Sequence, residues 1–207
     1  MFIERIREEY DPNVPIFTKN ILKMFPEYSR AYVFRLIKEA EKKGEIIKYT
    51  EGVYFMPTEI VLGPSTITAD DVIEKKYLRE KDDVYGIYSG IKLLNNFSIT
   101  TQMAGVVEVV TNYESSRCRE ITIKNRRYII RKSRCKIDKF NACAYTILQV
   151  FSEYEKVGTL NKRSIKKMQE YMKENGTTKE DLFSLSANFP AKTIQNLVGS
   201  GLLNELT

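Results

Sequence analysis

The chain contains no histidine and no tryptophan among its 207 residues, and it has only three cysteines. Without histidine, Ser–His and Cys–His nucleophilic catalysis are excluded, and the commonest general base at neutral pH is missing. Cys118, Cys135 and Cys143 are odd in number and show no Cys-x-x-Cys spacing. A metal site built from them would need an unusual fourth ligand. We therefore expect free thiols in a reducing compartment.

The sequence also lacks long hydrophobic runs. No apolar stretch approaches the roughly 18 to 20 residues that a membrane-spanning helix needs. The N-terminal sequence MFIERIREEY alternates apolar and charged residues, unlike a secretory signal. These absences predict a cytoplasmic protein with no membrane partner. The length allows one large domain or two modest ones, each able to bury a core.

Catalytic motifs are missing as well. The chain has no Walker A loop, no Gly-x-Gly-x-x-Gly and no nucleophile elbow. A restriction-type nuclease needs an acidic residue followed by Glu-x-Lys to hold a divalent metal. Asp83, Glu108 and Glu120, which precedes Lys124 by four residues, do not form that pattern. The sequence predicts no enzyme, no cofactor and no metal, with a metal-dependent nuclease as the alternative.

Positive charge is what the chain has in excess, and it is concentrated in one segment. Residues 117–139 carry ten basic and two acidic side chains, a net charge of +8, whereas the whole chain carries only +6. Residues 1–57 have a net charge of +1, with ten basic and nine acidic side chains. Local clustering of this kind indicates an anionic partner more strongly than a high overall isoelectric point does.

Residues 1–57 predict three helices followed by a β-hairpin. Pro15 is expected to open the second helix and Pro26 to end it. Ser29 is the expected N-cap of the third helix and Gly44 its C-cap. The helical period places four apolar residues of this helix on one buried face: Val33, Leu36, Ile37 and Ala40. Two short strands around Gly52 then form the hairpin.

This order of elements is typical of a winged helix-turn-helix domain, in which the third helix enters the DNA major groove and the hairpin lies against the backbone. Arg30 and Arg35 are then suited to guanine edges or phosphates, and the other polar residues to phosphates. The predicted DNA-binding residues are Tyr28, Ser29, Arg30, Tyr32, Arg35, Lys38 and Lys48. The alternative is a winged helix that binds only protein, with Arg35 and Lys38 as an ordinary solvated face.

Residues 58–207 predict a second, mixed α/β domain with a helical C-terminal bundle, which makes the fold class α+β. An extended connection rich in proline leads to a helix over 70–80. Strands are expected over 83–88 and 106–112, with a helix over 89–97 between them, and a basic hairpin over about 117–135. From Lys139 to the end the pattern is helical, and FNACAYTILQVFSEY predicts a buried helix.

The basic hairpin has three interpretations. It is a solvated sheet face, a set of additional phosphate contacts beside the winged helix, or a binding surface for RNA, a nucleotide or an acidic protein. Clustered basic residues favour contact with an anion. The predicted anion or antitoxin surface consists of Lys124, Arg126, Arg127, Arg131, Lys132 and Arg134.

The stretch YGIYSGIKLLNNFSITTQ, residues 85–102, interleaves small polar and apolar residues but offers no convincing nucleophile, base or metal ligand. We interpret it as architectural. Gly86 and Gly90 are expected to allow tight turns or close packing. The polar residues are expected to satisfy backbone groups at a helix start and in the following loop: Ser89, Asn95, Thr100, Thr101 and Gln102.

The sequence resembles the AbiEi antitoxins of bacterial type IV (abortive infection) toxin–antitoxin systems. The resemblance covers residues 1 to about 135 and rests on GVYFMP, on GIYSGIKLLNNFSITTQ and on VVEVVTN. The family typically has Gly-Leu-Thr-Thr-Gln followed by a proline. Here Ser98-Ile99 replaces Gly-Leu, and Ala104 stands where the proline would be, as in a divergent member.

The resemblance implies a bifunctional protein. An N-terminal domain over 1–57 would repress its own operon by binding inverted-repeat operator DNA. An antitoxin domain over 58–207 would counteract a nucleotidyltransferase-like toxin without a stable complex between the two proteins. The alternatives are a winged helix fused to a metal-dependent nuclease and a plain transcriptional regulator with no antitoxin role.

Overall fold

The computed structural model describes residues 2–60, 63–154 and 160–205. The chain forms two compact units, residues 1–75 and residues 76–207, and helices and strands occur in both. The predicted α+β class is confirmed. The first unit extends past Pro57, where we expected its last strand to end the domain.

The described residues before Pro57 form three helices and a small sheet in the first unit. The helices are α1 (Phe2–Glu9), α2 (Thr18–Met24) and α3 (Arg30–Lys42). Their apolar faces meet in one core, which includes Ile6, Ile21, Phe25, Val33 and Ile37. The predicted N-cap of α3 is confirmed, because Oγ of Ser29 accepts a hydrogen bond from the backbone N of Tyr32 at 3.3 Å. The C-cap is Lys43, and Gly44, predicted for that place, follows it in the left-handed conformation with a φ of +72°.

The sheet of the first unit has three strands in the order β1-β3-β2. Its strands are β1 (Ile16–Phe17), β2 (Ile47–Thr50) and β3 (Val53–Phe55). The predicted hairpin around Gly52 is confirmed by the antiparallel pairing of β2 with β3. The prediction that Pro15 opens a helix was wrong, because Ile16 and Phe17 are buried and pair with β3 before α2 begins.

The segment after Pro57 folds back on itself. β4 (Glu59–Ile60) and β5 (Gly63–Pro64) pair antiparallel, so the predicted extended connection is instead a short hairpin. Its base is tied together because the backbone N of Thr58 donates to Oγ of Ser65 at 2.8 Å. Asn13 also bonds both side chains, which links the hairpin to the loop before β1. Residues 61–62 lie outside the described residues.

The helix predicted over 70–80 is shorter than expected. α4 (Ala69–Ile73) begins at a capping box, in which Thr68 and Asp71 bond each other's backbone N–H groups. A π-helical turn, η1 (Glu74–Leu78), follows. β6 (Arg79–Glu80) then pairs with β7 (Asp83–Val84), so the last residues of the predicted helix are in a strand.

The second unit is built on a four-stranded mixed sheet with the order β10-β11-β9-β8. Its strands are β8 (Gly86–Ser89), β9 (Val107–Thr111), β10 (Cys118–Ile123) and β11 (Arg126–Lys132). β9 and β11 are parallel, and the other neighbours are antiparallel. The strand predicted over 83–88 divides in two, because β7 belongs to a separate small hairpin. The predicted basic hairpin, β10–β11, is confirmed.

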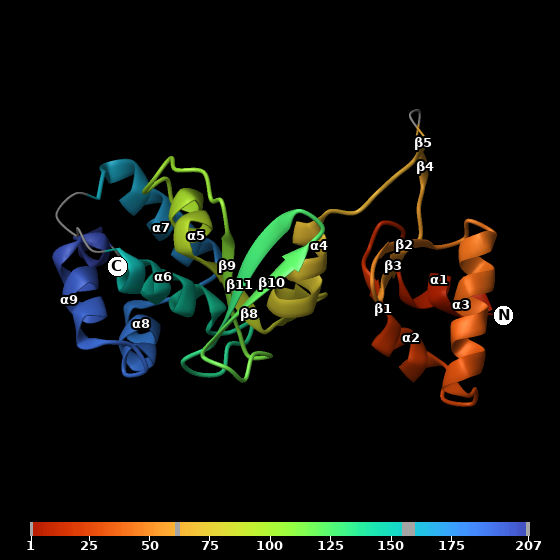
Figure 1. The fold of residues 1–207 in the computed structure, drawn as a ribbon. Helices are drawn as coiled ribbons and strands as arrows, with labels where there is room; N and C mark the ends of the chain where they lie inside the picture. Colours follow the sequence, from red (N-terminus) through yellow and green to blue (C-terminus); the bar gives the residue numbers. More distant parts are fainter. Residues whose placement is uncertain (1, 61–62, 155–159, 206–207) are drawn as a thin grey trace. The chain divides into compact units, whose positions relative to one another are not determined.

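In the described part of the second unit, the sheet is joined by five α-helices: α5 (Gly90–Asn96), α6 (Ala142–Glu153), α7 (Lys162–Glu174), α8 (Lys179–Ser186) and α9 (Ala191–Gly199). A final 3-10 turn, η3 (Leu202–Glu205), follows them. α6 is buried at nine consecutive positions from Cys143 to Phe151, as its composition predicted. α7, α8 and α9 gather around it to form the helical C-terminal part (Figure 1). Among the described residues, no helix is long and apolar enough to span a bilayer.

The strand register brings polar side chains to the face of the sheet that meets α6. Ile87 and Val110 are opposite each other in β8 and β9 and belong to the core around α6. Side chains alternate along a strand, so Ser89, Glu108 and Arg131 lie on this same face: Arg131 is beside Val110, and the pair Ser89–Glu108 lies two residues further along the strands. The apolar core therefore ends at a row of polar residues.

Candidate nucleic-acid interface and polar cavity

The residues predicted to bind DNA cluster at the exposed face and N-terminus of α3. The side chains of Tyr28 and Tyr32 are 45% and 37% exposed, and their rings lie 4.9 Å apart in an edge-to-face arrangement. The guanidinium of Arg35 lies 4.6 Å from the ring centre of Tyr32. Arg35 also forms an exposed ion pair with Glu39 at 3.7 Å. An exposed aromatic and basic row, Tyr28–Tyr32–Arg35, therefore begins just before α3 and continues along it.

The remaining predicted DNA-binding residues are all exposed, but they are held in different ways. Oγ of Ser29 is engaged as the α3 N-cap. The guanidinium of Arg30 lies 5.6 Å from the ring of Phe34, on another side of α3 from Tyr32. Lys38 also projects from α3. Lys48 lies in β2, where its Nζ pairs with Glu51 at 2.7 Å.

The predicted anion surface of the basic hairpin divides into two ends. Lys124, Arg126 and Arg127 surround the turn between β10 and β11, and we call these three residues the hairpin tip. Lys124 adopts a φ of +51° there, and Arg127 bonds Glu120 across the hairpin at 2.6 Å. All three tip residues are exposed, which leaves them accessible to a macromolecular partner.

The other three predicted residues lie at the far end of β11. Lys132 is exposed on the opposite face of the strand from Arg131. Arg131 contacts Glu108 of β9 through both Nε and Nη2, at 2.8 and 2.7 Å. The Arg134 guanidinium lies 5.3 Å from the ring of Phe189. The six residues therefore do not form one continuous surface on one face.

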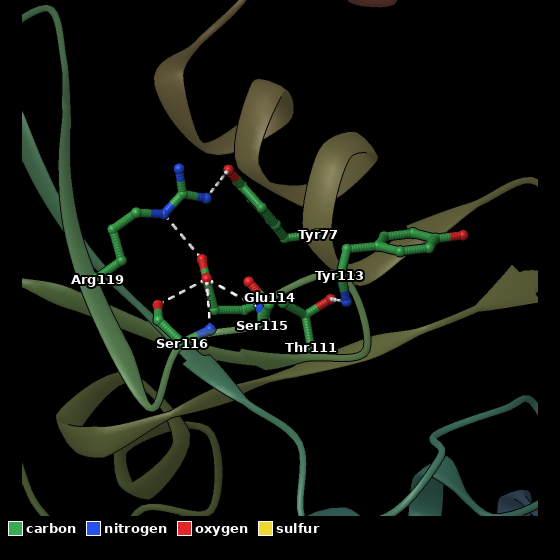
Figure 2. A network of polar contacts seen from close by, with 7 residues as sticks. All are labelled: Tyr77, Thr111, Tyr113, Glu114, Ser115, Ser116 and Arg119. Atoms are coloured by element: carbon green, nitrogen blue, oxygen red, sulfur yellow. Dashed lines mark hydrogen bonds and ion pairs between the residues drawn. The ribbon is translucent and has the colours of Figure 1, made fainter.

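A buried carboxylate organises the loop between β9 and β10 (Figure 2). Glu114 is 6% exposed. Its Oε1 accepts hydrogen bonds from the backbone of Ser115 and Ser116 and from Oγ of Ser116, at 2.7 to 3.1 Å. Its Oε2 accepts from Nε of Arg119 at 2.8 Å, and Arg119 in turn donates to Oη of Tyr77 at 3.1 Å. The network anchors the loop from which the basic hairpin starts.

These contacts lower the pKa of Glu114 to about 2, chiefly through the hydrogen bonds of Ser116, with a further contribution from Arg119. The same pairing raises the pKa of the Arg119 guanidinium. Each proton donor favours the charged carboxylate over the acid. Glu114 is therefore ionised over the physiological pH range, although it is buried. The sequence did not single it out.

The row of polar residues beside α6 lines a cavity of about 450 Å³. Sheet residues Glu108 and Arg131 form one part of its wall, and α5 contributes Gly90, Ile91 and Leu94. Arg134 and three residues from one face of α6 complete it: Gln149, Ser152 and Glu153. Charged and apolar side chains thus meet in a single cavity, which we call the polar cavity.

The carboxylate of Glu153 is fixed at the start of α5. Its Oε2 accepts from the backbone N of Gly90 at 2.8 Å, and its Oε1 accepts from Nε2 of Gln149 at 2.7 Å and from Oγ of Ser89. Ser89 was predicted to bond a backbone group at the start of this helix. That prediction was wrong, because α5 has no side-chain cap and the hydroxyl of Ser89 instead donates to Glu153.

The predictions for Asn95 and Thr100, that they bond backbone groups in the loop after α5, are confirmed. Nδ2 of Asn95 donates to the backbone O of Gln102 at 2.8 Å, and Oγ1 of Thr100 accepts from the backbone N of Gln102 at 3.2 Å. Gly90 has a φ of +63°, and a Cβ atom there would lie 2.9 Å from Oε1 of Glu108. The stretch is therefore architectural in the loop after α5, but its Ser89-Gly90 pair also shapes the polar cavity.

The acidic residues weighed for a nuclease site do not come together. Glu108 is paired with Arg131, and Glu120 is paired with Arg127. In the part of the chain that the structure describes, no group of three or more acidic or cysteine side chains is placed to hold a metal ion. The three cysteines are unpaired with one another, and burial raises the pKa of the Cys143 thiol to about 11.

Comparison with known protein families and with curated protein sequences finds no match to this chain.

Proposed function

We propose that this protein is a DNA-binding antitoxin of the AbiEi type, which represses its own operon and counteracts a nucleotidyltransferase-like toxin. In this proposal the first unit is a winged helix-turn-helix domain: α3 is the recognition helix, and β2–β3 is the wing. The observation that carries the proposal is the exposed row Tyr28–Tyr32–Arg35 on a capped, amphipathic helix that is followed by a β-hairpin.

The chemistry of this row suits a DNA groove. A guanidinium is able to bond a guanine edge or a phosphate with two parallel N–H donors. Tyr32 lies against the Arg35 guanidinium and restricts its motion, so less side-chain freedom is lost when a bond to DNA forms. Arg30, Lys38 and Lys48 add positive charge for phosphates. Repression of its own operon and the inverted-repeat operator follow from the family resemblance.

Replacing Arg35 by alanine tests the recognition helix. We expect Arg35→Ala to weaken binding to DNA from upstream of the protein's own gene by about 10- to 100-fold, because a base contact is worth about 1–3 kcal/mol. Fluorescence anisotropy with labelled DNA measures the Kd. Arg163→Ala is the matched control, since Arg163 is an exposed arginine on α7 of the second unit. Equal Kd values for Arg35→Ala and Arg163→Ala would reject α3 as the recognition helix.

We assign the antitoxin activity to the second unit, with the hairpin tip as its working surface. Lys124, Arg126 and Arg127 are exposed at the turn between β10 and β11. Concentrated basic side chains at such a turn suit an anionic target, either nucleic acid or an acidic protein surface. The resemblance implies that this target is met without a stable antitoxin–toxin complex.

Co-expression with the toxin encoded beside this gene tests the hairpin tip. We expect Lys124→Gln, Arg126→Gln and Arg127→Gln, combined in the full chain, to abolish protection of the cells, because the substitutions remove three positive charges from one turn. The matched control changes three exposed basic residues of α7 in the same way: Lys162, Arg163 and Lys166. Full protection by a soluble, folded tip variant would exclude the tip as the antitoxin surface.

A further inference from the structure

The polar cavity of the second unit has the size of small-molecule sites, and its lining is mostly charged and polar with an apolar part. Its volume of about 450 Å³ lies within the range of roughly 300–1,000 Å³ for ligand pockets. Such pockets combine an apolar wall with a few convergent polar groups. Here Ile91 and Leu94 of α5 supply the apolar wall, and the sheet and α6 supply the polar groups.

The charges of the cavity are balanced, which restricts the kind of ligand. Two guanidinium groups, Arg131 and Arg134, face two carboxylates, Glu108 and Glu153. A polyphosphate would bring several negative charges next to both carboxylates, and like charges at close range repel. A ligand that is itself charge-balanced, with one anionic and one cationic group, avoids this repulsion.

On the basic side of the cavity, one of the two guanidinium groups is placed to bind a carboxylate. Arg131 is held against Glu108 by two contacts at 2.7 and 2.8 Å. Arg134, by contrast, is exposed; its Nη2 lies 3.4 Å from Oγ of Ser152, and its guanidinium packs on Phe189. Its planar group is thus oriented by neutral contacts. A guanidinium of this kind binds a carboxylate with two parallel hydrogen bonds.

The opposite side of the cavity offers acceptors for a proton donor. Gln149 lines the cavity and is only 6% exposed. Its Nε2 donates to Glu153, which orients the amide, and its Oε1 accepts no hydrogen bond from any residue that the structure describes. A buried acceptor without a donor is unfavourable. This oxygen has almost no accessible surface, so we place the ammonium group of a ligand at the carboxylate of Glu153, which lines the cavity and is only partly buried.

We propose that the polar cavity binds a free α-amino acid with an apolar side chain. Arg134 binds its carboxylate, the carboxylate of Glu153 accepts from its ammonium group, and Ile91 and Leu94 pack on its side chain. All of these residues belong to the second unit, so this binding does not depend on the proposed contact of α3 with DNA.

Isothermal titration of the full chain tests the proposal with three matched probes: L-leucine, leucinamide and 4-methylpentanoate. The second probe lacks the carboxylate, and the third lacks the ammonium group. We expect L-leucine to bind and each of the other two to bind at least about tenfold more weakly, because each loses one charge-assisted contact. Equal affinity for all three would overturn the proposal, since the cavity would then recognise only the apolar part.

Two variants locate the site. Arg134→Gln is expected to weaken L-leucine binding at least about tenfold, whereas Arg163→Gln, an exposed arginine outside the cavity, leaves the Kd within about twofold. Circular dichroism checks that both variants are folded. No heat with any apolar amino acid at millimolar concentration would overturn the proposal. An unchanged Kd in Arg134→Gln would do the same, as would binding of a nucleoside monophosphate without binding of any amino acid.

Discussion

Gly86→Ala is expected to destabilise the second unit by about 3 kcal/mol or more, the largest effect that we predict for a single substitution. Gly86 is in β8, where a Cβ atom would lie 2.1 Å from the backbone O of Tyr77 and 2.7 Å from the backbone O of Val110. Both neighbours are backbone atoms, so neither is able to move aside by a side-chain rotation. The added methyl group would therefore push β8 away from η1 and β9, the two segments that supply these oxygens.

Gly105→Ala is the matched control, because a Cβ atom at Gly105 meets nothing within 4 Å. Thermal unfolding followed by far-ultraviolet circular dichroism measures both variants. We expect the Tm of Gly86→Ala to fall by roughly 10 °C and that of Gly105→Ala to stay close to the wild-type value. If Gly86→Ala and Gly105→Ala have the same Tm, η1 and β8 do not approach each other as closely as described.

Glu114→Gln is expected to lower the free energy of unfolding at pH 7 by about 2–3 kcal/mol. The folded protein lowers the pKa of Glu114 from its ordinary value of 4.5 to about 2, so ionisation favours the folded state. This contribution is complete above about pH 4.5. It is lost progressively as the pH falls from 4.5 toward 2, because the unfolded chain then binds a proton that the folded protein does not.

Urea unfolding of the wild type and of Glu114→Gln at pH 7, 5, 4 and 3 measures this contribution. The difference between the two proteins should be constant from pH 7 to 5 and should shrink at pH 4 and 3. Glu174→Gln, which changes an exposed glutamate at the end of α7, is expected to behave as the wild type does. A difference between Glu114→Gln and the wild type that is independent of pH would show that the network does not act through the charge of Glu114.

Local sequence signals predicted the parts of the fold that depend on near neighbours. Ser29 and Gly44 bound α3 because a cap is formed within one helical turn. The apolar composition of 140–154 predicted a buried helix, and α6 is buried at every position from Cys143 to Phe151. The basic hairpin was found because the two strands and their turn are contiguous in the chain.

The errors fall where distant segments decide the structure. β1 is only two residues long, and it exists because β3, more than 30 residues later, pairs with it. Residues 83–88 divide into two strands because β7 pairs with β6, whereas β8 pairs with β9. Ser89 was assigned to its own helix because only the fold brings Glu153 to it.

The polar cavity is the clearest case of this limit. Its charged and amide groups come from β9, β11, the segment after β11 and α6, so no local motif of the sequence contains them together. Arg131 and Arg134 were singled out as part of a basic surface. Their partners Glu108 and Ser152 could not be assigned to them without the sheet register and the position of α6.

Titration of the full chain with DNA from upstream of its own gene tests the central proposal most directly. A shuffled duplex of the same composition is the reference, and anisotropy is measured at 50 and 200 mM salt. We predict a Kd at least about 100-fold lower for the upstream DNA, with both affinities falling as salt rises because phosphate contacts release counterions. Equal affinity for the two duplexes, or no binding at 50 mM salt, would contradict the assignment of this protein as a DNA-binding regulator of its own operon.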